Sequence, residues 1–171
     1  MVFLVTVMKR AKQSAGILAF RRSTRDIEVF LVHPGGPYWA KRDMGVWSLP
    51  KGEFPEEEDG LAAAKREFGE ETGLIVEGQF LPLGTAKQRG GKIVTAWAIE
   101  ASLDPSHLKS NTFAMEWPPK SGRMRNFPEI DKADWFTLDQ ARKKILKGQA
   151  PFLDRLAALL LGIELQRPPI R

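Results

Sequence analysis

Three glutamates, Glu67, Glu70 and Glu71, are spaced i, i+3 and i+4 along the chain. In an α-helix of about 3.6 residues per turn, this spacing places the three carboxylates within about 100° of one face. Like charges so close together repel one another, and a bound cation would offset that repulsion. Because all three ligands are oxygen atoms, we predict Mg²⁺ as the first choice of ion and Mn²⁺ as the second. The alternative is a solvated acidic surface.

A helix over residues 56–72 is expected to carry these glutamates. Its apolar positions recur at i, i+3 and i+7 and are Leu61, Ala64 and Phe68. This pattern predicts one face buried against a sheet and an opposite face that holds the metal. We expect acidic residues 56–59 in the early part of the helix, where the dipole favours negative charge, with Pro55 near its start. Gly73 is expected to end the helix in a left-handed conformation.

The stretch from residue 52 to residue 74 contains more than the three glutamates. Its glycine and charged positions are Gly52, Glu58, Arg66, Glu67, Glu70, Glu71 and Gly73, with apolar Phe68 and Leu74 between and after them. This spacing resembles the Nudix box without a mismatch. The resemblance implies an α+β fold, a Nudix α/β/α sandwich around a mixed β-sheet. It also implies metal-dependent hydrolysis of a nucleoside diphosphate linked to another group.

The resemblance also implies roles for individual residues. The carbonyl of Gly52 is expected to reach the metal together with the three glutamates. Glu58 and Arg66 are expected to be structural, with Arg66 holding a carboxylate in place. We predict that Glu67 or Glu70 also acts as the catalytic base.

Many members of the family recruit a further acid from a later loop. Glu116 is our candidate, because it lies in a long polar segment, residues 102–125, that we expect to overhang the site. The alternative is a solvated loop glutamate. Glu129 is a second candidate, and its alternative role is simply to precede the next strand.

Basic and aromatic residues outside the box are candidates for substrate binding. For the phosphates we select Lys51, Lys41 and Arg42, with Arg123 and Arg125 as weaker candidates. For stacking on a base we select Trp39, Tyr38 or Trp117. Each of these side chains has the alternative of being packed or solvated.

The composition limits the class of protein. The chain of 171 residues is expected to form one domain, and its net charge of +5 favours phosphate-rich partners, either nucleotides or nucleic acid. Cysteine is absent, which excludes thiolate metal sites and cysteine nucleophiles and fits a cytoplasmic protein. Because His33 and His107 are far apart, we expect no histidine ligand pair. No apolar run in the sequence is long enough to span a membrane.

The other elements follow from apolar runs separated by turn residues. Strands are predicted over residues 15–22, 27–33, 74–83, 92–101 and 131–136, and helices over 138–147 and 151–163. We assign residues 1–12 to an N-terminal extension, 13–163 to the Nudix hydrolase domain and 164–171 to a tail. The natural start is either Met1 or Met8, and in the first case residues 1–7 could add an edge strand.

Sequence features outside the box narrow the substrate only in part. His-Pro-Gly-Gly-Pro at 33–37 and Trp-Ser-Leu-Pro-Lys-Gly-Glu at 47–53 are similar to bacterial predicted nucleoside triphosphate pyrophosphohydrolases. Residues 135–136 and 149–155 are similar to the C-terminal part of some diadenosine tetraphosphate hydrolases. Three functions stay open: a pyrophosphohydrolase of nucleoside triphosphates or dinucleoside polyphosphates, an RNA 5′ pyrophosphohydrolase, and a non-catalytic nucleotide sensor.

Overall fold

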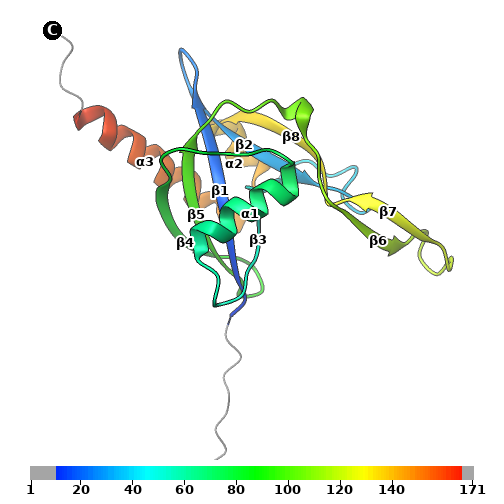
Figure 1. The fold of residues 1–171 in the computed structure, drawn as a ribbon. Helices are drawn as coiled ribbons and strands as arrows, with labels where there is room; N and C mark the ends of the chain where they lie inside the picture. The colour runs from blue at the N-terminus through cyan, green and yellow to red at the C-terminus, as the bar shows by residue number, and fades with distance from the viewer. Residues whose placement is uncertain (1–10, 167–171) are drawn as a thin grey trace, which may run out of the picture.

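The computed structural model describes residues 11–166, so the alternative starts at Met1 and Met8 lie outside the described residues. A six-stranded mixed sheet has the order β4-β5-β1-β2-β8, and β3 also pairs with β1 (Figure 1). Its strands are β1 (Gln13–Arg22), β2 (Ile27–Pro34), β3 (Lys51–Glu53), β4 (Leu81–Lys87), β5 (Ile93–Glu100) and β8 (Ile130–Thr137). β1 runs parallel to β5 and antiparallel to β2 and β3.

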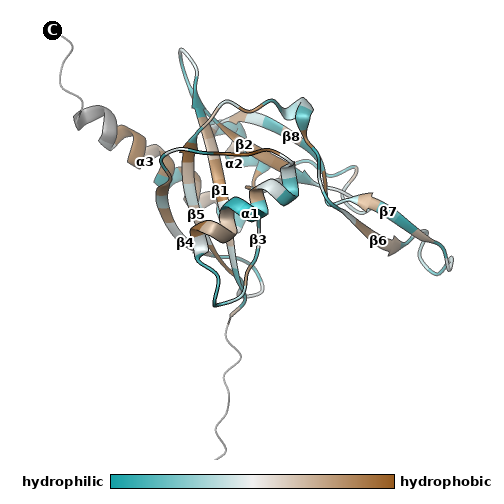
Figure 2. Cartoon of the chain, viewed as in Figure 1, coloured by the Kyte–Doolittle hydropathy of each residue, from teal (hydrophilic) through white to brown (hydrophobic). Residues whose placement is uncertain are grey.

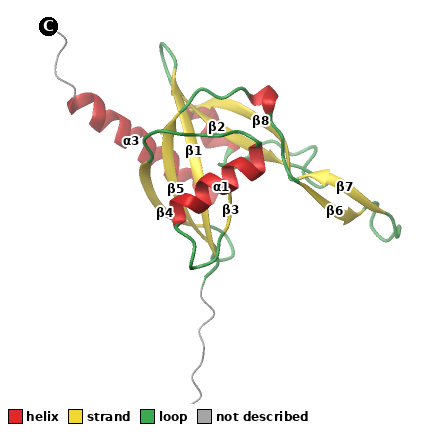
Figure 3. Cartoon of the chain, viewed as in Figure 1, coloured by secondary structure: helices red, strands yellow, loops and turns green. Residues whose placement is uncertain are grey.

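Helices cover both faces of this sheet (Figure 3). α1 (Gly60–Thr72) packs on one face, and α2 (Leu138–Lys144) and α3 (Ala150–Gln166) pack on the other. The arrangement confirms the predicted α+β fold with a mixed sheet between helical layers. None of the helices within residues 11–166 combines the length and hydropathy needed to span a bilayer.

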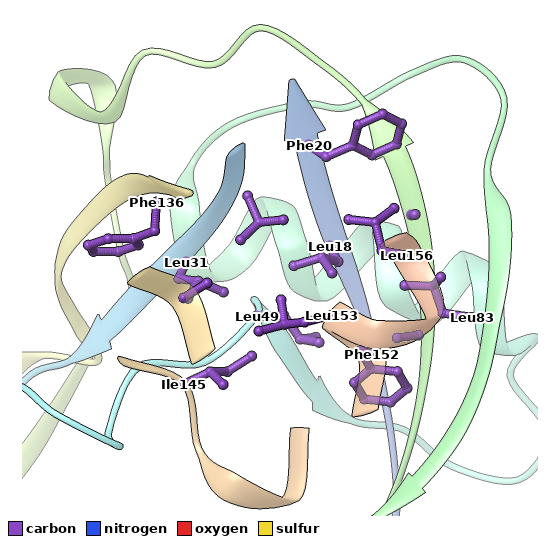
Figure 4. Close-up of a cluster of buried hydrophobic side chains, with 14 of the residues drawn as sticks. Leu18, Phe20, Leu31, Leu49, Leu83, Phe136, Ile145, Phe152, Leu153 and Leu156 are labelled. Carbon is purple, nitrogen blue, oxygen red and sulfur yellow. The ribbon is translucent and has the colours of Figure 1, made fainter. Parts of the chain in front are cut away.

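Alternate residues of β1 serve two separate hydrophobic cores. Ile17 and Ala19 face α1, whereas Leu18 and Phe20 face α2 and α3. Successive side chains of a strand point to opposite faces, so a strand covered on both sides is apolar at every position. Figure 2 shows this hydrophobic stretch in the middle of β1, and Figure 4 shows Leu18 and Phe20 among the side chains of the second core.

α1 begins later than the sequence predicts. Asp59 caps it by accepting a hydrogen bond from the N–H of Ala62 at 3.0 Å, and the first helical residue is Gly60. The predictions of acidic residues in the first turn and of Pro55 at the start were therefore wrong. Asp59 itself caps the helix, by accepting from a backbone N–H group that has no partner within the helix. The end was predicted correctly: Gly73 is left-handed, with a φ of 70°, and its N–H donates to the carbonyl of Gly69.

Two further expectations about strands need correction. β4 begins at Leu81, so residues 74–80 form a connection rather than a strand. The segment 102–125 is not a loop throughout, since β6 (Thr112–Glu116) and β7 (Met124–Pro128) form a two-stranded hairpin of their own, preceded by a short 3₁₀ turn at Pro105–His107. Figure 1 shows this hairpin extending away from the main sheet.

Candidate active site

The short strand β3 lies directly against the carboxylate face of α1. A Cβ atom on Gly52 would lie 1.9 Å from Oε2 of Glu67, so no other residue fits at this position without moving that carboxylate. One residue earlier, the backbone N–H of Lys51 donates to Oε2 of Glu71 at 3.1 Å. β3 therefore brings Gly52 and Lys51, two predicted site residues, to the predicted metal ligands.

Arg66 organises the remaining carboxylates. Its Nε and Nη2 donate to the two carboxylate oxygens of Glu58, both at 2.9 Å, in a bidentate pair. Its Nη1 donates to Glu67 at 2.8 Å and to Glu70 at 3.2 Å. The pairing lowers the pKa of Glu58 and raises the pKa of Arg66. Arg66 thus orients Glu67 and Glu70 of the carboxylate face, and Glu58 fixes Arg66.

Burial shifts the pKa values of the charged groups at the inner end of the carboxylate face. Burial raises the pKa of Glu71 to about 7, and the nearby carboxylates of Glu67 and Glu129 add to the effect. Burial also raises the pKa of Glu67, against the opposing hydrogen bond from Arg66. Burial lowers the pKa of Lys51, whose ammonium faces the same low-dielectric region. Charged groups are poorly solvated here, which is the environment in which a bound cation is most stabilising.

A cavity of about 260 Å³ opens beside these groups. Its polar or aromatic lining residues are Trp39, Ser48, Lys51, Glu71 and Glu129, and its apolar lining residues are Val32, Pro34, Val46, Ile130 and Leu146. An apolar cavity with a few convergent polar groups and shifted pKa values is the expected form of a small-molecule site.

Glu129, not Glu116, is the acid outside the box that reaches this site. Glu129 lines the cavity and raises the pKa of both Glu67 and Glu71. Glu116 is exposed at the end of β6, paired with Met124 across the hairpin, and does not line the cavity. The segment predicted to overhang the site is instead the β6–β7 hairpin, which extends away from the main sheet with Glu116 on it. The chain after β7 returns Glu129 to the carboxylates.

The loop of residues 34–43 forms a second wall of the cavity through Pro34 and Trp39. The N–H of Gly35 donates to the carbonyl of Glu129 at 2.8 Å, and a Cβ on Gly35 would lie 1.9 Å from the carbonyl oxygen of Pro128. His33 is buried, with Nδ1 2.7 Å from Oδ1 of Asp131 and Nε2 2.6 Å from the carbonyl oxygen of Arg42. These contacts tie both ends of the loop to the segment that holds Glu129.

The loop brings only some of the predicted substrate-binding residues to the cavity. Trp39 lines it and is 37% exposed, so one surface of the indole is free to meet a ligand. The guanidinium of Arg42 lies 5.1 Å from the centroid of that ring, on which it stacks. Lys41 is exposed in the same loop and, like Arg42, is not among the residues lining the cavity. Tyr38 contacts Trp117 of the hairpin edge-to-face at 5.3 Å.

The residues on the carboxylate face suit a divalent cation. Among residues 11–166, no three acidic or histidine side chains already form a group that could hold an ion. The donors are all carboxylate or carbonyl oxygens, and the mutual repulsion of Glu67, Glu71 and Glu129 is only partly relieved by Arg66 and Lys51. Oxygen donors of this kind suit a hard divalent cation such as Mg²⁺.

Comparison with known proteins identifies the family. The model of the NUDIX domain matches residues 10–156. The chain belongs to the Nudix family. Its membership, together with the fold, makes it a Nudix pyrophosphohydrolase. No curated protein matches the chain at a significant level.

Solved structures share the Nudix fold at low sequence identity. An Ap4A hydrolase of C. elegans in a binary complex is 22% identical, with a TM-score of 0.61, over 89% of this chain and 99% of that one. The NUDIX domain of Shewanella oneidensis NrtR, complexed with ADP ribose, is 15% identical, with a TM-score of 0.60, over 90% of each chain. A mutT/nudix family protein of Listeria innocua is 15% identical, with a TM-score of 0.62, over 94% of this chain and 100% of that one.

Proposed function

We propose that this Nudix enzyme uses Mg²⁺, with Mn²⁺ as a substitute, to hydrolyse a phosphoanhydride bond in a nucleoside triphosphate or dinucleoside polyphosphate. The observation that carries the proposal is the cavity that places Trp39, Lys51, Glu71 and Glu129 together beside the carboxylates of α1. Two structurally similar proteins are an Ap4A hydrolase and a NUDIX domain complexed with ADP ribose, which supports a nucleotide as the substrate class.

Each residue contributes by its position. The exposed surface of Trp39 would stack on the base, and the ammonium of Lys51 would contact phosphate oxygens inside the cavity. Glu67, Glu70 and Glu71, with the carbonyl of Gly52 and the carboxylate of Glu129, would hold the metal. When bound, Mg²⁺ supplies charge neutralisation of the phosphate chain and activation of water.

Glu67 is the better of the two candidates for the base. Its side chain is 14% exposed and is fixed between Gly52 and Arg66, whereas the side chain of Glu70 is 46% exposed. Burial raises the pKa of the Glu67 carboxylate, which favours its use as a proton acceptor. Arg66 holds that carboxylate in one orientation, so removal of Arg66 should reduce turnover more than substrate affinity.

A second candidate function is hydrolysis at the 5′ end of RNA, which the net charge of +5 favours. The two functions differ in their dependence on salt. A long RNA would release many counterions on binding, and a mononucleotide few, so only the RNA reaction should slow steeply as salt is added.

A phosphate-release screen with Mg²⁺ tests the proposal. The substrates are nucleoside triphosphates, dinucleoside polyphosphates, nucleotide sugars and 5′-triphosphate RNA. Glu70→Gln is the inactivated variant, and Glu57→Gln is its matched control, because Glu57 is exposed and lies outside the box spacing. We expect hydrolysis of a free nucleotide, lost in Glu70→Gln and kept in Glu57→Gln. Silence across the panel, in folded protein that binds Mg²⁺, would contradict the proposal and favour a nucleotide sensor.

A further inference from the structure

A second, strongly basic cavity lies at the turn between β4 and β5. Its volume is about 580 Å³, and its charged lining residues are Lys12, Lys87, Arg89 and Lys92. The rest of the lining is formed by Ala11, Gly90, Gly91 and Ile93, so no acidic residue lines the cavity. Gly90 and Gly91 present no side chain, and a Cβ built on either meets nothing within 4 Å. This part of the wall is therefore open to an incoming ligand.

Strand β3 connects this basic cavity to the active site. Its three consecutive residues contact the two regions in turn: Lys51 contacts Glu71, Gly52 contacts Glu67, and Glu53 contacts the basic cavity. Glu53 pairs with Lys92 at 2.8 Å and with Lys12 at 3.7 Å. Residues two apart on a strand lie about 7 Å apart with their side chains on the same side, so Glu53 is about that far from Lys51, whose side chain lines the active-site cavity. The basic cavity and the active-site cavity are therefore neighbours along β3.

The four cationic side chains of this cavity differ in whether they have an acidic partner. Glu53 pairs with Lys92 and Lys12, and its pKa is lowered by the hydrogen bond from Lys92. Within residues 11–166, neither Lys87 nor Arg89 has an ion-pair partner, so the charge of these two side chains is not neutralised. Lys87 and Arg89 are both exposed at the open side of the turn. Like charges gathered at a concave surface create a local positive potential that attracts anions.

We infer that this basic cavity binds the distal phosphate groups of a polyphosphate chain whose nearer phosphates lie at the carboxylates of α1. The link between the two sites rests on the proposed function, whereas the anion site itself does not. The inference deepens the assignment of the substrate, since a nucleotide with a long phosphate chain should be preferred over one whose chain ends at the carboxylates.

A binding experiment without metal tests the anion site directly. The probe is inorganic tripolyphosphate, titrated calorimetrically into metal-free protein. We compare wild type with Lys87→Ala/Arg89→Ala, and use Arg25→Ala/Lys143→Ala as a control that removes the same charge from exposed positions outside the cavity. The cavity variant should bind on the order of tenfold more weakly, as expected for the loss of two exposed charge contacts, and the control should bind like wild type. Absence of binding to wild type, or equal loss in both variants, would overturn the inference.

Two further arms identify the source of the phosphate chain. The kcat/KM ratio of a nucleoside tetraphosphate to the matching triphosphate should exceed one in wild type and fall toward one in the cavity variant. An unchanged ratio would overturn the link to the active site. If no nucleotide is hydrolysed, the proposed function fails while the titration still tests the anion site. A 5′-monophosphate oligonucleotide that binds more tightly than tripolyphosphate, and loses affinity in the same variant, would overturn the polyphosphate assignment in favour of nucleic acid.

Discussion

The two walls of the active site differ in how the chain builds them. The α1 wall comes from one continuous segment, in which residues three and four apart share a helix face and β3 immediately precedes the helix. The second wall joins the loop of residues 34–43 to Glu129, almost a hundred positions later, through the hydrogen bond from Gly35. Local periodicity can specify the first wall, whereas only tertiary packing can specify the second.

The hairpin of β6 and β7 explains why the second wall is hard to foresee. Phe113 of the hairpin lies close enough to Gly36 that a Cβ there would be 3.0 Å from the ring, and Trp117 contacts Tyr38. The hairpin therefore supports the loop, while Glu129 follows directly after β7. A contribution to catalysis by either wall can be tested by substitutions that change one and leave the other intact.

The largest effect should come from a methyl group added to the α1 wall. Gly52→Ala would place a Cβ on the carboxylate of Glu67, and we expect kcat to fall about a hundredfold, as a displacement near 1 Å at a catalytic group can produce. Steady-state kinetics measures the loss, and circular dichroism checks that the fold is kept. Ala62→Gly, on the exposed side of α1, is the control for a change of one methyl group. Gly45→Ala is unsuitable because Gly45 has a φ of 70°, a conformation in which alanine would be strained. Wild-type turnover in Gly52→Ala would contradict the placement of Glu67.

The next effect tests which acid belongs to the second wall. Glu129→Gln should lower kcat roughly thirtyfold, in the range seen when a group supporting a metal site is removed. Glu116→Gln removes the same charge from the exposed hairpin and should leave kcat unchanged. Parallel kinetics on the two variants gives the comparison. Loss of turnover in Glu116→Gln alone would contradict the role of Glu129 and support Glu116, the candidate predicted from the sequence.

A smaller effect should separate substrate binding from catalysis. Trp39→Ala removes the only large aromatic surface that lines the cavity among the described residues, and we expect KM to rise about tenfold, as for a lost base-stacking contact. kcat should change little, because the carboxylates are untouched. Trp117→Ala is the control, because Trp117 contacts Tyr38 of the same loop and does not line the cavity. Trp117→Ala should raise KM by less than Trp39→Ala. Trp97 is unsuitable as a control because it packs against Gly60 in the core. Equal KM values for wild type and Trp39→Ala would exclude stacking on this indole.

The smallest effect concerns pH. The folded pKa of Glu71 is raised to about 7 from a usual value of 4.5, so the metal-free fold is stabilised by the proton and loses that stability as pH rises from about 4.5 towards 7. Metal binding must displace this proton, so affinity for Mn²⁺ should rise about threefold between roughly pH 6.5 and 7.5. Calorimetry in two buffers of different ionisation enthalpy would detect the released proton. Glu71→Gln should abolish the release, and a pH-independent affinity in wild type would contradict the raised pKa.

The sequence specified the α1 wall well because its determinants are local. The spacing of Glu67, Glu70 and Glu71 predicted one shared helix face, and Gly73 ends the helix as expected. The start was misplaced because several acids before Gly60 suit a helix N-terminus, and only the geometry of Asp59 decides among them.

The wall formed by the loop of residues 34–43 and Glu129 could not be predicted from the spacing of residues in the sequence. β6 and β7 are only five residues each, and their part-buried residues are Phe113, Met115 and Phe127, so the apolar alternation is too short to predict their pairing. His33 looked isolated from any functional group in sequence. Its burial between Asp131 and the carbonyl of Arg42 depends on β2 and β8 being neighbours in the sheet. For the same reason, no local signal distinguished Glu129 from Glu116.

Manganese binding followed by electron paramagnetic resonance tests most directly whether the two walls form one site. The titration compares wild type with Glu67→Gln, Glu129→Gln and Glu116→Gln in the absence of substrate. We predict weaker Mn²⁺ binding in both Glu67→Gln and Glu129→Gln, and wild-type binding in Glu116→Gln, because only the first two carboxylates meet beside the cavity. Wild-type Mn²⁺ affinity in Glu129→Gln, with loss in Glu67→Gln, would contradict a shared site and confine the metal to α1.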